Sequence, residues 1–264
     1  MTLDIGLVVG NAALIGVILC IARNFENRNP IEANQSTAAI VVDYKLSILK
    51  YLSSSLITPA SRVWAIMIVN AAGGGWIHLR TDGWWFLFSS IVVIIALELW
   101  SYFVHRASHR FGPLWAMHSL HHSAEALSMV TGARHFWLED PLLNTAFPVM
   151  AILFTIPPEI ATTLAFVYFL TEGMVHLNLR VSLGRCALWL NNPQYHRIHH
   201  SVEPQHQDKN FCKMLPLIDV IFGTAWKPGQ DEFPRTGVSG EKATGVLDGL
   251  MWPLRHRIPV LSRR

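Results

Sequence analysis

The chain alternates between long apolar stretches and polar segments, and two apolar stretches are long enough to cross a membrane. Residues 3–22 carry a single charge, Asp4, and residues 84–104 carry a single charge, Glu98. A helix of about 20 apolar residues spans the ~30 Å hydrocarbon core of a bilayer. We therefore predict membrane-spanning helices over both ranges.

A further apolar region is interrupted, and a polar segment precedes it. Residues 24–45 are polar and predict a loop. Residues 46–77 are apolar but contain Pro59 and three glycines at 73–75, which are residues that interrupt helices. The pattern predicts an interfacial helix followed by one span at about 61–77.

The second half of the chain contains an apolar region with two prolines at its centre. Pro157 and Pro158 divide residues 141–176 into halves that are each short for a crossing. We therefore predict a helical hairpin that dips into the bilayer. From about residue 180 the chain is polar and contains Pro and Gly, which predicts a cap outside the membrane.

Basic residues predict the orientation. Arg23 and Arg28 follow the first span, and Lys and Arg concentrate on the cytoplasmic side of membrane proteins. Counting spans from there places the predicted cap in the cytoplasm. The fold class is therefore all-α: a multi-span membrane helical bundle with a cytoplasmic helical cap. We divide it into N-terminal membrane helices with a loop (1–83), a catalytic domain (84–228) and a C-terminal cytoplasmic tail (229–264).

Composition agrees with a membrane protein and excludes several other classes. Hydrophobic residues make up 51% and charged residues 15% of the chain, against about 25% charged in an average soluble domain. The net charge is only +3 and no basic stripe is present, so we predict no nucleic-acid partner. The three cysteines are scattered without a CxxC pair, which argues against a disulfide scaffold and a thiolate zinc site.

Histidine is the residue type that requires a chemical explanation. Eight of the 13 histidines fall in three five-residue windows. These windows are His105-x-x-x-His109, His118-x-x-His121-His122 and His196-x-x-His199-His200. Positions i, i+3 and i+4 share a helix face, so we expect each window to present its imidazoles in one direction.

So many imidazoles together favour a metal site. They would repel one another if protonated, and would lose hydration if buried without partners. A metal removes both costs because it binds neutral nitrogens. Eight ligands exceed the four of one tetrahedral ion, which favours two metals and a histidine-rich dimetal site in the cap. The ligand type alone leaves iron, zinc and copper open.

The order of the three windows in a multi-span chain resembles the fatty acid hydroxylase / sterol desaturase superfamily of integral-membrane di-iron oxygenases. Segments 192–195, 208–211 and 219–224 resemble the closing segments of that family. The resemblance covers roughly residues 84–228. It implies two iron ions, O2 as co-substrate, and attack on a C–H bond of a lipid from the bilayer.

The resemblance also implies a ligand set. The eight window histidines match the iron ligands of the family, and one more histidine matches a ligand between the second and third windows. The implied metal ligands are His105, His109, His118, His121, His122, His176, His196, His199 and His200.

Three acidic or histidine positions near these ligands are candidates for supporting roles. Glu98 shares a face with the first window, and Glu172 shares a face with His176, so we expect both carboxylates to orient ligand imidazoles through their second N–H. His135, with Glu139 and Asp140 nearby, matches the family less closely, and we weigh a supporting role for it above metal binding.

Partners and location follow from the same resemblance. The chain has no GxGxxG fingerprint for a flavin or dinucleotide, so we expect electrons from a separate cytoplasmic donor, a ferredoxin or a cytochrome with its NAD(P)H reductase. We expect a multi-pass protein of the bacterial inner membrane, or of the endoplasmic reticulum if eukaryotic, with its active site on the cytoplasmic side. Two alternatives stay open: a lipid or sterol desaturase with the same site, and a non-redox membrane zinc hydrolase or metal carrier.

Overall fold

The computed structural model describes residues 17–32, 36–139, 146–238 and 243–255, and this part of the chain is mostly helical. The longer helices are α2 (Thr37–Ala71), α3 (Trp84–Arg110), α4 (Gly112–His122), α6 (Ala146–Leu153) and α7 (Pro158–Val175). The shorter ones are α8 (Pro193–His199), α9 (Pro216–Ile221), α10 (Val246–Leu250) and α11 (Trp252–Arg255), with 3-10 turns η1 (Thr131–Ala133), η2 (Gly184–Leu188) and η3 (Pro204–His206).

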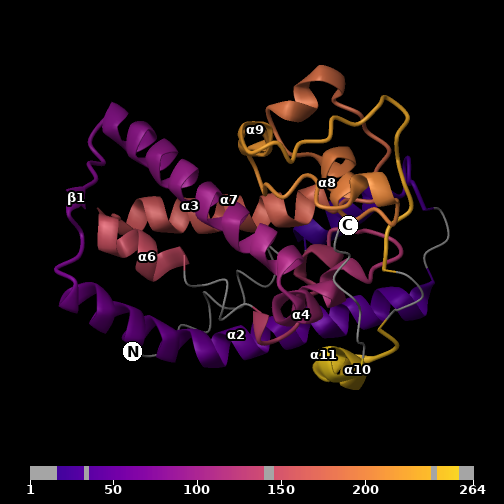
Figure 1. Ribbon diagram of the computed structural model, residues 1–264, viewed down its shortest axis with the longest axis horizontal. Helices are drawn as coiled ribbons and strands as arrows, with labels where there is room; N and C mark the ends of the chain where they lie inside the picture. The colour runs from indigo at the N-terminus through magenta and orange to yellow at the C-terminus, as the bar shows by residue number, and fades with distance from the viewer. Residues whose placement is uncertain (1–16, 33–35, 140–145, 239–242, 256–264) are drawn as a thin grey trace.

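The long helices form one part of the molecule and the short helices gather at one end of it. Figure 1 shows α2 along one side, α3 and α7 crossing each other above it, and α8 and α9 at the end away from β1. The predicted span over residues 3–22 lies largely outside the described residues, although residues 17–26 are helical. The all-α fold class is confirmed at the level of a mostly helical chain.

Helix α3 matches the predicted span over residues 84–104 and extends beyond it to Arg110. It has 27 residues, which is about 40 Å of helix. Among the described residues, it is the one helix that is long and apolar enough to cross a membrane. Only 28% of its apolar window is buried within the protein. An apolar helix with so small a buried share is suited to lipid contact.

Helix α2 corrects two predictions. The predicted loop over residues 24–45 is wrong in its second half, because α2 begins directly after Ser36, whose side chain accepts a hydrogen bond from the backbone of Ala39. The predicted interruption at Pro59 is also wrong, because α2 continues through it for 35 residues. Two polar residues near the start of α2 are buried against other segments: Asp43 forms a 2.7 Å ion pair with Arg134, and Ser47 donates to the carbonyl of Val130.

The predicted division of the apolar region 141–176 is confirmed. Helix α6 ends before Pro157, whose backbone is extended, and α7 begins at Pro158. The short strand β2 (Phe154–Thr155) lies between them and pairs in parallel with β1 (Ile77–His78), a pairing that the sequence did not predict. Whether this hairpin dips into the bilayer stays a prediction.

Helix packing brings the three histidine windows together. Helix α3 packs against α4, and α7 packs against α8, so the ends of four helices that carry histidines meet. The closing segments hold this arrangement: the carboxylate of Asp219 accepts hydrogen bonds from the backbone of Phe211 and Cys212 and from the hydroxyl of Tyr195. The buried rings of Tyr102 and Phe211 continue this contact onto α3.

Candidate metal centre

The nine histidines that the sequence singled out lie in two adjacent clusters. The first cluster contains His105, His109, His118, His122 and His199. The second cluster contains His121, His176, His196 and His200. Within each cluster, one ring nitrogen from every member lies within 4.8 Å of the others, so each cluster is able to hold a metal ion.

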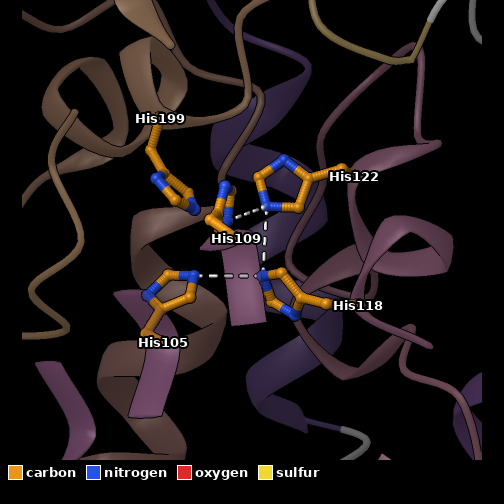
Figure 2. A group of neighbouring side chains, drawn as sticks. All are labelled: His105, His109, His118, His122 and His199. Carbon is orange, nitrogen blue, oxygen red and sulfur yellow. Dashed lines mark hydrogen bonds between the residues drawn. The ribbon is translucent and has the colours of Figure 1, made fainter. Parts of the chain in front are cut away.

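The ring nitrogens of the first cluster point toward a common centre. Figure 2 shows the five imidazoles converging from α3, α4 and the end of α8. The Nε2 atom of His118 lies 3.1 Å from Nε2 of His105 and 3.1 Å from Nε2 of His122, which lies 3.1 Å from Nε2 of His109. Nitrogens bound at about 2.1 Å to one ion lie about 3 Å apart when the angle between them is near 90°.

The second cluster has the same spacing. The Nε2 atom of His176 lies 3.2 Å from Nε2 of His121 and 3.0 Å from Nε2 of His196, and Nε2 of His200 lies 3.1 Å from Nε2 of His196. All four side chains are buried.

Backbone carbonyls determine which ring nitrogen carries the proton in three of these imidazoles. The Nδ1 atoms of His105, His199 and His176 lie 2.6–2.8 Å from the carbonyl oxygens of Phe211, Lys209 and Glu172, and a carbonyl only accepts. In the neutral ring, Nε2 is then a bare acceptor. Acceptors that face one another at about 3 Å without a cation between them repel, so this donor set fits metal ions.

Burial favours the neutral form of four of these imidazoles, His121, His122, His199 and His200. Loss of hydration, opposed in part by the backbone carbonyl, lowers the pKa of His199 to about 3. Loss of hydration and the neighbouring imidazoles hold the pKa values of His121, His122 and His200 well below the ordinary histidine value. Neutral imidazole is the form that binds a metal.

The expectation that each window presents its imidazoles in one direction is wrong for two windows. His118 and His122 belong to the first cluster, whereas His121 between them belongs to the second. In the last window the assignment is reversed, and only His199 joins the first cluster. Positions i and i+4 differ by about 40° around a helix, while i+3 lies about 60° to the other side of i. A helix between two sites therefore sends its i, i+4 pair to one and its i+3 residue to the other.

The predicted role of Glu98 is wrong. Its carboxylate accepts hydrogen bonds from the hydroxyl of Tyr168 at 2.9 Å and from the backbone N–H of Met214 at 2.8 Å. The Nδ1 atom of His105, which Glu98 was expected to orient, donates to the carbonyl of Phe211 instead. Glu98 therefore ties α3 to α7 and to the closing segment.

The predicted role of the Glu172 side chain is also wrong. His176 donates to the backbone carbonyl of Glu172, which is available because the last carbonyls of a helix lack helical partners. The carboxylate accepts instead from Nζ of Lys213 at 2.6 Å, and its second oxygen lies 3.7 Å from Nε2 of His135.

The sequence missed the acceptor of His118, which is Glu139. Its Oε1 atom lies 2.7 Å from Nδ1 of His118, and its Oε2 atom lies 3.0 Å from Nδ1 of His135. The i, i+4 spacing of His135 and Glu139 could have predicted the contact between these two residues. The contact of Glu139 with His118 joins residues 21 positions apart, which the sequence spacing does not predict. The ring of His135 stacks on the ring of His121, a position from which it could support the site. The supporting role itself stays a prediction. Asp140 lies outside the described residues.

A cavity of about 310 Å³ adjoins both clusters. Its apolar wall comes from α3 and α7 and includes Leu97, Trp100, Val104, Leu164 and Val175. Its polar wall includes Lys50, His135, Glu139, Glu172 and Lys213. Histidines of both clusters, His105, His118, His121, His176 and His196, also line it. A molecule in this cavity therefore contacts both apolar side chains and imidazoles of the two clusters.

Comparison with curated proteins finds relatives over part of their length. The chain is 31% identical to an alkylglycerol monooxygenase of Danio rerio over 53% of this chain and 30% of that protein. It is 26% identical to the ornithine lipid hydroxylase OlsE of Rhizobium tropici over 68% of this chain and 54% of that protein. It is 30% identical to the very-long-chain aldehyde decarbonylase GL1-1 of Oryza sativa subsp. indica over 55% of this chain and 26% of that protein. The matched region spans from about a quarter to just over half of these relatives.

The family comparison covers the region that holds the site. No solved structure matches the chain. The family described as fatty acid hydroxylase matches residues 90–224, just over half of the chain, and this range includes every histidine of both clusters. The chain therefore belongs to the fatty acid hydroxylase family, within the superfamily that its histidine windows resemble.

Proposed function

We propose that this protein is a membrane-bound di-iron oxygenase that hydroxylates a C–H bond of a lipid, using O2 and electrons from a separate donor. One observation carries the proposal. Two clusters of five and four imidazoles, seven of the nine buried, adjoin a cavity with apolar lining residues, in a chain that belongs to the fatty acid hydroxylase family. The names of the relatives, a monooxygenase and a lipid hydroxylase among them, support it.

The nine clustered histidines would hold the two iron ions, five imidazoles on one and four on the other. When bound, iron at such a site supplies the activation of O2 and the oxidation of the C–H bond. The protein contributes position and surroundings. The backbone carbonyls of Phe211, Lys209 and Glu172 fix the tautomers, and the apolar wall from α3 and α7 excludes water around the bond that reacts.

The substrate that fits this cavity is a lipid. Side chains of α3 and α7, such as Leu97 and Leu164, line the cavity, while other side chains of α3, such as Ile91 and Ile95, are exposed on its outer surface. Helix α3 therefore offers apolar side chains both to the cavity and to the bilayer, and a lipid would contact the outer ones. The volume of about 310 Å³ accommodates one segment of a membrane lipid and leaves the rest in the bilayer.

Electrons would come from a cytoplasmic donor, a ferredoxin or a cytochrome with its NAD(P)H reductase. We place the chain in the bacterial inner membrane, or in the endoplasmic reticulum of a eukaryote, as a multi-pass bundle. The histidine clusters and the short helices after residue 180 would then form the cytoplasmic cap.

This topology predicts opposite labelling of the segment before α3 and of the C-terminal tail. In a cysteine-free background, Asp82→Cys lies before α3 and Asp231→Cys lies in the tail, and both positions are exposed. We expect a membrane-impermeant maleimide to label position 82 in intact cells, and position 231 only after the membrane is permeabilised. Labelling of position 231 in intact cells would contradict the cytoplasmic cap.

The reaction is tested with labelled oxygen. We expect the purified iron-loaded protein, given 18O2, a reduced donor and extracted membrane lipids, to form a lipid product that carries one heavy oxygen atom. A product lighter by two hydrogens and without the label would identify a desaturase. If the product forms without O2 or a donor and its oxygen comes from water, the protein is a hydrolase and the oxygenase proposal is wrong.

A further inference from the structure

Glu139 is a buried carboxylate that bridges two imidazoles. Its Oε1 atom accepts from Nδ1 of His118 at 2.7 Å, and its Oε2 atom accepts from Nδ1 of His135 at 3.0 Å. Only 3% of the residue is exposed. Both oxygens therefore have fixed partners, and their geometry is protected from competing water.

The two contacts connect Glu139 to both clusters. His118 belongs to the first cluster and presents Nε2 to its neighbours there. The ring of His135 stacks on His121 of the second cluster, with ring centroids 4.2 Å apart and an angle of 11° between the planes. One carboxylate thus contacts a member of one cluster directly and reaches the other through a stacked ring.

The acceptor on His118 differs from the other acceptors at the site. The Nδ1 atoms of His105, His199 and His176 each donate to a backbone carbonyl, whereas Nδ1 of His118 donates to a carboxylate. A carboxylate is a stronger acceptor than a carbonyl, because a hydrogen bond to an ionised group is about twice as strong. It makes the opposite nitrogen of the imidazole more basic, and so a better ligand.

We propose that Glu139 is a positioning residue of the metal centre, which holds His118 with its Nε2 toward the first cluster and holds the ring of His135 against His121 of the second. The inference rests on one part of the proposed function, namely that the two clusters bind metal. Partners of this kind change metal affinity by 10–100-fold when they are removed.

Three substitutions separate the two contacts. Glu139→Ala removes both hydrogen bonds. Glu139→Gln keeps the shape and an amide oxygen that accepts from His118. His135→Phe keeps an aromatic ring on His121 and leaves the contact of Glu139 with His118 in place. Asp231→Asn, at an exposed position of the tail, is the matched control for the loss of a carboxylate.

The experiment measures metal affinity, not turnover. Purified protein loaded with iron is titrated with a competing chelator, and the bound metal and the number of imidazoles around it are followed by mass spectrometry and X-ray absorption. We expect Glu139→Ala to weaken one metal equivalent by about 10–100-fold and to lower the imidazole count. Glu139→Gln should recover most of this loss, His135→Phe should lose less than Glu139→Ala, and Asp231→Asn should match the unchanged protein.

Two results would overturn the inference. The first is a Glu139→Ala protein that holds both metal equivalents as tightly as the unchanged protein. The second is an equal loss in the Ala and Gln variants together with an equal fall in the melting temperature of their metal-free forms, which is the signature of a fold contact alone. An unchanged protein that binds no metal at all would instead refute the proposed function.

Discussion

Replacing His121 by Ala and, in a separate variant, His122 by Ala is expected to abolish turnover in both, while each substitution weakens a different metal site. The two residues are neighbours in the chain, but Nε2 of His122 lies 3.1 Å from Nε2 of His118 in the first cluster, and Nε2 of His121 lies 3.2 Å from Nε2 of His176 in the second. We expect turnover to fall by more than about 100-fold, because loss of a ligand exceeds the 10–100-fold cost of losing a ligand's partner.

The metal content should distinguish the two variants. His121→Ala leaves three imidazoles in its cluster and should retain about one metal equivalent, whereas His122→Ala leaves four and should bind two equivalents, one of them more weakly. Mass spectrometry of the purified proteins measures the metal, and product formation from membrane lipids measures turnover. His78→Ala is the control, since His78 is exposed on β1 and belongs to neither cluster. Equal metal content and turnover in all three variants would refute the assignment of the clusters.

The sequence predicts the nine clustered histidines but not their division between two sites. The predicted helix that carries His118, His121 and His122 is confirmed as α4, but its three imidazoles divide between the two clusters. The sequence does not show that α4 lies between two sites. That position depends on the packing of α3 and α7 against α4 and α8, contacts that no spacing within one window encodes.

The supporting carboxylates show the same limit. Glu98 and His105 lie two helical turns apart on one stripe, which makes a contact plausible, but the backbone of Phe211 occupies the position beside His105. Glu139 is separated from His118 by 21 residues, and the loop that joins them determines their contact. Partners from distant segments compete with partners on the same helix, and only the folded chain decides between them.

Helix α2 illustrates how tertiary contacts override local signals. Proline within a helix costs about 3 kcal/mol, and polar residues favour loops, so residues 24–45 and Pro59 predicted breaks. The interior ion pair of Asp43 with Arg134 and the packing of Leu46 against Trp252 give the first part of α2 partners in distant segments of the chain. Those partners stabilise the helical form of the first third of α2, where the sequence predicted a loop.

Metal-free protein is expected to lose stability as the pH falls below about 6.5, and bound metal should remove most of this dependence. Burial lowers the pKa of His199 to about 3, and burial with neighbouring imidazoles holds the pKa of His121 well below the ordinary value of 6.5. Between those values the unfolded chain binds protons that the folded chain does not, so acid favours unfolding. Each such histidine contributes up to about 1.4 kcal/mol per pH unit, and the stability that they provide is fully present above pH 6.5.

His135 affects the stability of the protein at alkaline pH and not at acid pH. Burial is the largest single effect and would lower its pKa, but the charge and hydrogen bond of Glu139, together with Glu172, raise the pKa to about 9. The stability that His135 contributes is fully present below 6.5, the pKa of histidine in the unfolded chain, and is lost as the pH rises through 9. His135 therefore does not change the loss of stability expected at acid pH.

Thermal unfolding of metal-depleted and iron-loaded protein measures this difference. Between about pH 7 and pH 5 we expect the melting temperature of the metal-depleted protein to fall by more than about 10 °C. The loaded protein should change much less over the same range, because a metal ligand binds no proton until the metal leaves. The loss of the metal at still lower pH should then coincide with unfolding. A metal-depleted protein whose melting temperature stays constant between pH 7 and pH 5 would show that the clustered imidazoles are not buried and neutral, and that the clusters are not formed in the absence of metal.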